Sequence, residues 1–440
     1  MLRKIVKAII PRGLFRAIEP AGHLLEAMMW QIVMGFPARK LHVIGVTGTN
    51  GKTTTSLMIY TMLENAGYKV GLMTTVAYGS QGHMREQMVH MTTSGTRVLL
   101  SRIKEMRSEG IQWLVLETTS HALAQNRVWG IPYSVAVMTN LTHEHLEYHR
   151  TFERYREAKV KMFRLASANS NGLRTGIVNA DDPSAPYFAA AVPTVLRFSS
   201  RQSQSELLAT NIRSTPTGSQ YDLRYEDRHL HIKTSLPGSF NVENSLAAAG
   251  AGLAIGLTNE QVEQGIAALK SVEGRMTRIE EGQNFDAIVD YAHSPDSFEK
   301  LFKDMKPLVK GRMIVVFGSQ GNTGDVGKRA IQGKLAGDYA DLVVVTEEDD
   351  RGEDGNSILE QIATGAEDAG KVRDKNLWLI LNRAEAIAYA VGLAKRDDAV
   401  LVLGKGHEKT IERKAEGSEP WDEPGTVRHA VRQRLDEKGH

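Results

Sequence analysis

Short apolar runs alternate with longer segments of mixed polarity along most of this 440-residue chain. Residues 41–46 form a β-prone run, a Gly/Thr-rich turn follows, and residues 53–66 repeat apolar side chains with the period of a helix. Further runs with the length of buried strands occupy residues 113–116, 135–138 and 176–178. This alternation predicts an α/β fold whose sheet is mostly parallel and carries helices on both faces.

The pattern changes between residues 205 and 235. Two alternating segments, residues 221–225 and 229–234, predict an antiparallel hairpin, and an Ala-rich helix is expected at residues 244–255. A second α/β series then begins near Arg278. Its expected strands are residues 287–289, 313–316, 342–345, 377–381 and 399–403.

These changes of pattern divide the chain into three expected parts. Residues 1–40 are a short basic and apolar helical segment, residues 41–277 a central domain, and residues 278–440 a C-terminal Rossmann-like α/β domain. A chain of this length is also too long for one hydrophobic core, which favours more than one domain.

The N-terminal segment carries seven Lys/Arg against two Glu, and residues 21–36 are almost wholly apolar. One interpretation is a helix packed on the main body. The alternative is that residues 1–38 make peripheral contact with a membrane surface or a lipid-linked substrate. We expect no membrane-spanning segment, because no run of 18 or more apolar residues occurs.

Composition narrows the class of protein. Hydrophobic and charged residues make up 41% and 24% of the chain, as in ordinary globular proteins. The formal net charge of +2 provides no strong field for nucleic acid, so we expect none as a partner. The absence of cysteine excludes disulfides, thiol nucleophiles and cysteine-ligated zinc. A cytoplasmic, monomeric enzyme acting on small molecules is expected.

A glycine-rich segment, G-V-T-G-T-N-G-K-T from Gly45 to Thr53, lies between an expected strand and an expected helix, the context that a nucleotide phosphate loop requires. Glycines let backbone N–H groups turn toward phosphates, and the N-terminus of the helix favours negative charge. Lys52 is expected to reach the β- and γ-phosphates, and the Thr53 hydroxyl to bind Mg²⁺. The central part is therefore predicted to be a P-loop ATPase domain that binds ATP through Gly48, Thr49, Asn50, Gly51, Lys52, Thr53 and Thr54.

Two further segments carry polar side chains suited to a metal. Glu117 follows an expected buried strand, and a carboxylate at that edge of an open α/β sheet, facing the phosphate loop, is expected to bind Mg²⁺. Three histidines, at positions 143, 145 and 149, fall within seven residues. Zinc is the alternative there, but the lack of cysteine and of an H-E-x-x-H pattern disfavours it.

The loop T-G-T-N-G-K-T-T-T resembles that of the Mur ligase family, and the resemblance continues over roughly residues 41–425. Residues 139–149 are similar to the family's T-N-L-x-x-D-H-L-D-Y-H, with Glu144 in place of Asp. Residues 158–163 are similar to its A-K-x-x-L-F, in which the lysine is carbamylated. The resemblance implies a second Mg²⁺ ion with His145 as a ligand alongside Glu117, and a carbamate that turns Lys159 into a carboxylate-like ligand. The expected catalytic residues are Lys52, Glu117, His145 and Lys159.

The resemblance also implies roles in binding ATP and the substrates. It assigns ATP contacts to Asn244 of an F-N-x-x-N motif, Arg275 of a G-R-M motif and Asp290 of a D-Y-A-H-x-P-D motif. Contacts with the acceptor or the incoming amino acid are implied for Thr92, Thr93, Ser120, His293, Asp349, Arg351, Gly404 and Glu408.

Within the family, the resemblance is greatest to ligases that add an amino acid to a muramoyl dipeptide in peptidoglycan precursor synthesis. It implies three steps: ATP phosphorylates a carboxylate, an amine attacks the acyl phosphate, and amide, ADP and phosphate are released. Family members carry a uridine-nucleotide domain before the phosphate loop, whereas this loop begins at Gly45. The acceptor is therefore expected to be UDP-linked, lipid-linked or neither.

Two motifs depart from the family pattern on the amino-acid side. Glu348-Asp349-Asp350-Arg351 stands where D-N-P-R is usual, and residues 321–325 replace a G-G-D-R-D loop. Acidic side chains favour a cationic substrate, so a diamino acid is expected. The alternatives are a related ligase acting on folate or a storage peptide, and a catalytically silent nucleotide-binding subunit.

Overall fold

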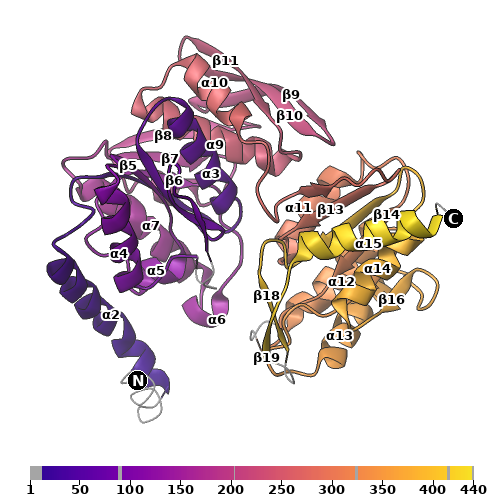
Figure 1. Cartoon of the computed structure of the whole chain (residues 1–440). Coiled ribbons are helices and arrows are strands. Elements are labelled where there is room, and N and C mark those ends of the chain that lie inside the picture. The colour runs from indigo at the N-terminus through magenta and orange to yellow at the C-terminus, as the bar shows by residue number, and fades with distance from the viewer. Residues whose placement is uncertain (1–11, 88–91, 203, 323–325, 414–416, 439–440) are drawn as a thin grey trace. The chain divides into compact units, whose positions relative to one another are not determined.

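The computed structural model describes residues 12–87, 92–202, 204–322, 326–413 and 417–438. The chain divides into two compact units (Figure 1). Unit 1 comprises Met1–Arg213, Gln220–Thr234 and Asn241–Leu269, and unit 2 comprises Ser214–Ser219, Ser235–Phe240 and Lys270–His440. The domain limits expected from the sequence stay predictions.

Unit 1 is built on a sheet whose order, among the described residues, is β11-β10-β9-β8-β7-β6-β1-β5-β2-β3-β4. The strands β9, β8, β7, β6, β1, β5 and β2, in this spatial order, pair in parallel. At the β2 side, β3 and β4 add an antiparallel edge. The strands are β1 (His42–Thr47), β2 (Val70–Met73), β3 (Ala77–Ser80), β4 (Arg85–Glu86), β5 (Trp113–Glu117), β6 (Tyr133–Met138), β7 (Thr175–Asn179), β8 (Thr194–Ser199), β9 (Leu207–Thr215), β10 (Gly218–Tyr225) and β11 (Arg228–Thr234).

The position of β1 determines where ligands can bind. It lies between β5 and β6, with Val46 opposite Glu117 and Thr47 opposite Met138. Because these strands run in parallel, their carboxyl ends and the loops that follow meet at one edge of the sheet. Ligands of open α/β sheets bind at such an edge.

Helices cover the sheet of unit 1. One buried core combines β1, β5 and β6 with apolar side chains of α4, α5, α7 and α8. Elsewhere α10 packs closely on α3, since a Cβ at Gly265 would lie 2.6 Å from the Cα of Met62. The helices are α2 (Arg12–Met34), α3 (Lys52–Asn65), α4 (Thr96–Ser108), α5 (Ser120–Ala124), α6 (Leu146–His149), α7 (Phe152–Ala168), α8 (Ala185–Ala189), α9 (Ser239–Ile255) and α10 (Asn259–Ala268).

Unit 2 contains a second sheet, of order β12-β13-β17-β14-β15-β16, with all described pairs parallel except β12 with β13. Its strands are β12 (Thr277–Ile279), β13 (Asp286–Asp290), β14 (Met313–Phe317), β15 (Leu342–Val345), β16 (Leu377–Leu379) and β17 (Ala399–Leu403), and β18 (Thr410–Arg413) pairs separately with β19 (Gly417–Pro420).

Side chains of this sheet alternate between two cores. Met313 and Val315 of β14 belong to a core shared with α11, α12 and α13, whereas Ile314 and Val316 belong to one shared with α14 and α15. A strand covered on both faces reads as a continuous apolar run, which is why these strands were readable from the sequence. The helices are α11 (Pro295–Met305), α12 (Gly327–Tyr339), α13 (Gly355–Asp368), α14 (Arg383–Leu393) and α15 (Glu423–Lys438).

The predicted fold class is confirmed: both units are α/β with mostly parallel sheets. The sequence pattern missed β2, β3, β4, β8, β9, β12, β18 and β19. Several of these are short or partly exposed strands, and only the first two residues of β9 pair with β8, so their apolar signal is weak. Of the N-terminal segment, residues 12–34 form α2, and residues 1–11 lie outside the described part.

Candidate active site

The phosphate loop predicted from the sequence connects β1 to α3. Gly51 caps α3 with φ of +81° and no side chain bonds to the first N–H groups of the helix. A Cβ at Gly48 would lie 1.9 Å from Thr139 Oγ1, and one at Gly51 would lie 2.1 Å from Asn244 Oδ1. Glycine is therefore required at both positions, and an uncapped helix N-terminus of this kind fits a phosphate group.

Residues after β6 hold this loop in place. Asn140 O accepts the N–H of Thr49 at 2.9 Å, and Asn140 Oδ1 accepts the N–H of Asn50 at 2.9 Å. The hydroxyl of Thr139 donates to Asn50 O at 2.6 Å. The side chain of Lys52 donates to Thr49 O at 2.7 Å, so it lies along the same loop.

Glu117, at the end of β5, is 1% exposed and faces the start of α3. Its Oε2 atom accepts the Thr53 hydroxyl and the N–H of Thr75, each at 3.0 Å, and Oε1 accepts the Thr75 hydroxyl at 3.0 Å. The structure thus brings together two predicted magnesium ligands, Thr53 and Glu117. Hydroxyl and carboxylate oxygens are the ligands that Mg²⁺ prefers.

Lys159, on α7, is 2% exposed and donates to Gly48 O at 2.5 Å. Burial lowers the pKa of this lysine well below its usual value, and nearby Lys52 lowers it further, while Glu144 and Glu117 act in the opposite direction. No carboxylate forms an ion pair with it in the described structure, so burial favours the neutral amine over the charged form. A neutral amine is the form that reacts with CO₂.

His145 occupies the left-handed N-cap of α6, with φ of +56°. Its ring centre lies 4.7 Å from that of His121 and 6.2 Å from that of Tyr155, and its Nε2 lies 3.8 Å from Glu144 Oε2. Tyr155 OH in turn lies 3.0 Å from Thr49 Oγ1, and Lys159 Nζ lies over the Tyr155 ring, 4.7 Å from its centre. Glu117 and Lys159 therefore contact the loop that carries Lys52, and His145 is linked to it through Tyr155.

The alternative of zinc at the three histidines stays a prediction. In the described ranges, no group of three or more His, Cys, Asp and Glu side chains is placed to hold a metal ion. The ring of His143 lies against Phe152, at 4.7 Å between centres, whereas His149 Nε2 lies 3.0 Å from Ser120 Oγ. His145 and His149 nevertheless share a neighbour, since their ring centres lie 4.7 and 5.4 Å from that of His121.

Several residues expected to contact the acceptor are already engaged with the protein. The Thr93 hydroxyl donates to Glu117 O and accepts the N–H of Thr119, each at 3.0 Å. Thr92 Oγ1 accepts the Thr75 hydroxyl at 3.0 Å, and Ser120 is 1% exposed. Thr92 and Thr93 thus connect the segment before α4 to the loops after β2 and β5, and these contacts orient Glu117.

Asn244 and Thr54 lie beside the same loop. Asn244 Oδ1 accepts the Thr55 hydroxyl at 3.4 Å, and its Nδ2 donates to Asn241 Oδ1 at 3.0 Å. Thr54 is 5% exposed.

In unit 2, Asp290 ends β13 and accepts the N–H groups of Met276 and Ala292 at 2.8 and 2.7 Å. Burial raises the pKa of this carboxyl, and Arg275 opposes the rise. The guanidinium of Arg275 lies over the ring of Tyr291, 4.5 Å from its centre. Asp290 therefore fixes the turn that carries Arg275.

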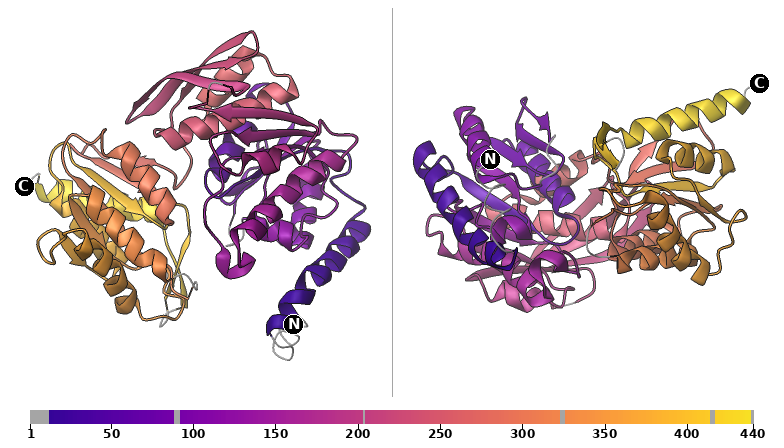
Figure 2. Two further views of the ribbon diagram at one scale, coloured as in Figure 1. Left: turned by 180° about the vertical axis from the view of Figure 1, so that it is seen from behind. Right: turned by 90° about the horizontal axis from the view of Figure 1, so that it is seen from below.

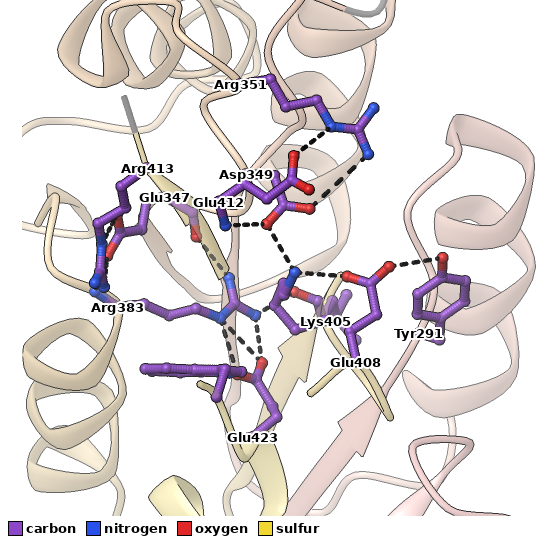
Figure 3. Close-up of polar contacts among 12 residues, drawn as sticks. Tyr291, Glu347, Asp349, Arg351, Arg383, Lys405, Glu408, Glu412, Arg413 and Glu423 are labelled. Carbon is purple, nitrogen blue, oxygen red and sulfur yellow. Dashed lines mark hydrogen bonds and ion pairs between the residues drawn. The ribbon is translucent and has the colours of Figure 1, made fainter. Parts of the chain in front are cut away.

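A buried charged network follows β15 and β17 (Figure 3). Lys405 Nζ lies 2.8 Å from Asp349 Oδ1 and 2.6 Å from Glu408 Oε2. Glu408 Oε1 also accepts the Tyr291 hydroxyl at 3.3 Å. Burial lowers the pKa of Lys405, but Glu408 and Asp349 together raise it above its usual value, so this lysine stays charged.

Arg351 and His293 lie at the margin of this network. Arg351 is 40% exposed, and its Nη2 lies 4.0 Å from Asp349 Oδ2. His293 Nδ1 lies 2.9 Å from Tyr291 O. The sequence analysis missed Lys405 as a site residue, although it lies between the expected site residues Gly404 and Glu408.

Glu348 is a second residue that the sequence analysis missed. It is 2% exposed, its Oε1 has no hydrogen-bond partner in the described structure, and burial raises its pKa. A Cβ at Gly404 would lie 3.0 Å from Glu348 Oε2, so Gly404 makes room for this carboxyl. A buried carboxyl oxygen without a partner is a binding position for a cationic or hydrogen-bonding ligand. Of the loop at residues 321–325, residues 323–325 lie outside the described part.

Comparison with known protein families finds two matches. Residues 46–252 match the Mur ligase middle domain, and residues 274–406 match the Mur ligase, glutamate ligase domain.

Comparison with curated proteins finds relatives that are similar over most of this chain. The chain is 38% identical over 409 residues to UDP-N-acetylmuramyl-tripeptide synthetase of Roseiflexus sp. (strain RS-1), covering 90% of this chain and 80% of the relative. It is 38% identical over 419 residues to UDP-N-acetylmuramoyl-L-alanyl-D-glutamate--2,6-diaminopimelate ligase of Geobacillus thermodenitrificans (strain NG80-2), covering 95% and 84%.

Solved structures agree with these matches. A structure of UDP-N-acetylmuramoyl-L-alanyl-D-glutamate--2,6-diaminopimelate ligase aligns with a TM-score of 0.64 and 28% identity, covering 96% of this chain and 83% of that one. Folylpolyglutamate synthase of Mycobacterium tuberculosis aligns with a TM-score of 0.70 at 18% identity, covering 87% and 92%. The second likeness concerns the fold alone.

Proposed function

Because the chain belongs to the Mur ligase family of ATP-dependent ligases, we propose that it joins an amino acid to a muramoyl-dipeptide-type acceptor in peptidoglycan precursor synthesis. The relatives' names, which refer to tripeptide synthesis and to diaminopimelate, support the class of acceptor and of amine. We further propose that the reaction takes place in the cytoplasm and proceeds through an acyl phosphate.

The observation that carries this proposal is the state of Lys159. It is buried against the phosphate loop, where it donates to Gly48 O, and burial lowers its pKa well below the usual value. Such burial disfavours the charged form, which a lysine that only balanced phosphate charge would need. A neutral amine at this position suits reaction with CO₂, which would supply a carbamate oxygen for a metal ion.

Four side chains would hold Mg²⁺ in this proposal: Thr53, Glu117, His145 and the modified Lys159. The ion would neutralise phosphate oxygens and so make the γ-phosphoryl group a better electrophile. The chain's own groups do the remaining work in unit 1. Backbone N–H groups at the start of α3 and the ammonium of Lys52 bind phosphates, and Asn140 keeps the loop in shape.

Unit 2 would hold the incoming amino acid. Arg351, which is 40% exposed, offers a cationic group for a carboxylate and can make the two-bond contact that carboxylates favour. Glu348 offers the buried carboxyl oxygen without a partner for a distal ammonium group. This pairing supports a diamino acid, with Arg275 and Asp290 assigned to ATP.

The test measures phosphate release from MgATP and the mass of the product, with a panel of amines and with UDP-linked or lipid-linked muramoyl dipeptide. We expect release to require both acceptor and amine, and a diamino acid to give the highest turnover. Glu348→Gln should raise KM for that amine without changing KM for ATP. ATP turnover without amine dependence would favour a regulatory nucleotide-binding subunit, and activity only with folate or glutamate would favour another ligase of the superfamily.

A further inference from the structure

Helix α2 presents an apolar face to solvent. Leu25, Ile32 and Val33 are 68%, 68% and 66% exposed, and Met28 and Met29 are also exposed. Residues spaced by four, seven and eight positions share one side of a helix, so Leu25, Met29, Ile32 and Val33 form a continuous stripe. We call Leu25, Met28, Met29, Ile32 and Val33 the outer face of α2.

The opposite side of α2 is the one that packs on the protein. Ala27 and Gln31 are fully buried, and Gln31 Nε2 donates to Trp129 O at 2.8 Å. Trp30 lies under the guanidinium of Arg97, 5.0 Å from its ring centre. Figures 1 and 2 show α2 lying along the outside of unit 1. The helix is therefore already anchored, and its outer face is available for something else.

Such a face is unusual on a globular protein. Single exposed apolar residues are common and need no explanation. Five on one side of one helix form a contiguous patch, and such patches mark interaction surfaces. No charged side chain lies within the outer face. The nearest acid, Glu26, lies at its edge and reaches His23 on the packed side, at 3.4 Å.

Charge around the helix indicates the kind of partner. Residues 1–40 carry seven Lys/Arg against two Glu, whereas the whole chain carries 54 Lys/Arg against 52 Asp/Glu. Positive charge is therefore concentrated in this segment. Arg39 and Lys40 are exposed after the helix ends at Met34, and the sequence places Arg12 and Arg16 in its first turns. A helix with an apolar stripe and flanking basic residues is typical of segments that lie in the headgroup layer of anionic membranes.

We propose that α2 docks this chain on an anionic lipid surface, with its outer face among the headgroups and its basic residues on the phosphates. The helix would lie on the membrane, because no helix in the described ranges is long and apolar enough to cross one. A second copy of the chain is a poorer occupant of this face. Pairing two outer faces would bring two basic segments together, and like charges oppose association.

Vesicle flotation of the full chain tests the proposal. Vesicles of phosphatidylcholine alone are compared with vesicles that contain phosphatidylglycerol, at low and high salt. The apolar test variant is Leu25→Gln/Ile32→Gln, since glutamine keeps helix propensity but removes the apolar surface. Its matched control is Ile331→Gln/Val372→Gln, which changes two residues of unit 2 that are each 52% exposed. The charge variant is Arg39→Gln/Lys40→Gln.

We expect binding to the anionic vesicles only, lost at high salt. The partition coefficient should fall roughly tenfold in the apolar variant and about as much in the charge variant, with no change in the control. Equal binding to both vesicle types, or binding unaffected by Leu25→Gln/Ile32→Gln, would overturn the proposal. So would a dimer, detected by light scattering, that this variant converts to a monomer. Circular dichroism verifies that each variant folds, and ligase turnover in solution is read separately, because the proposal does not depend on it.

Discussion

Two buried lysines, one in each unit, have pKa values shifted in opposite directions. Lys159 of unit 1 is 2% exposed and Lys405 of unit 2 is fully buried, so both lose nearly all contact with water. Burial lowers the pKa of Lys159 well below the usual range. In Lys405 the same burial is outweighed by Glu408 and Asp349, and its pKa is raised.

The difference lies in the neighbours that the fold supplies. Lys159 faces a backbone carbonyl, that of Gly48, and another lysine contributes to its field. Lys405 lies between two carboxylates at 2.8 and 2.6 Å. Burial with ion partners favours the charged form of a lysine, whereas burial without one favours the neutral amine. Residue type and burial together therefore do not determine what a lysine does.

The largest expected effect comes from removing Lys159. Lys159→Ala should lower ligase turnover roughly 10³-fold, comparable to losing a preorganised electrostatic group at a reacting centre. The control is Lys161→Ala, two residues away on the same helix, which should change turnover less than about threefold because no role at the reacting centre is proposed for it. Steady-state kinetics with saturating ATP measures both. If Lys159→Ala kept full activity, the distinction between a reactive and a structural lysine would fail.

Stability should show the reverse order. Lys405→Met leaves Asp349 and Glu408 buried without their partner and should cost unit 2 about 3–5 kcal/mol. Lys159→Met removes an amine with no ion partner and should change the stability of unit 1 by less than about 1 kcal/mol. Native-state hydrogen exchange of amides in β17 and β6 reports the two units separately. Equal losses in both variants would mean that the two lysines are energetically alike.

The pH dependence of stability should have opposite signs at the two sites. Unfolding returns Lys159 to a pKa near 10.5, so the unfolded chain binds more protons below that pH and stability rises with pH, by at most about 1.4 kcal/mol per unit. Lys405 keeps its proton longer when folded, so its contribution is constant below about pH 10.5 and is lost above it. Denaturation in CO₂-free buffers from pH 8 to 11.5, relative to the two methionine variants, measures both slopes.

The smallest expected effect concerns the neutral member of the unit 2 network. Tyr291→Phe removes the hydroxyl that donates to Glu408 at 3.3 Å and should cost about 1 kcal/mol. Tyr389→Phe, with a ring that is 39% exposed, serves as the control and should cost nothing measurable. A loss as large as that of Lys405→Met would show that the hydrogen bond, rather than the ion pairs, holds Glu408.

The sequence contained much of this arrangement. Continuous apolar runs predicted the central strands of both sheets, and Gly51-Lys52-Thr53 predicted the phosphate loop between β1 and α3. The apolar run that became β5 also predicted Glu117 at the correct edge of the sheet, because parallel strands end together.

Other features depend on contacts between distant parts of the chain. Lys159 meets Gly48 across 111 residues, so its helix alone gives no sign that it is buried. Lys405 has one partner close in sequence, Glu408, and one 56 residues away, Asp349. The sequence alone does not bring the distant partner to the lysine. The outer face of α2 could not be predicted either, because the sequence of an apolar helix does not show which side packs on the protein. The structure shows it through the hydrogen bond from Gln31 to Trp129 O.

The backbone at Gly48 lies between two side chains. Lys159 lies behind its carbonyl oxygen with almost no surface exposed, and Thr139 fills the space on the other side. Lysine-directed labels react with the amines that they can reach, so we expect them to modify exposed lysines and to leave Lys159 unmodified.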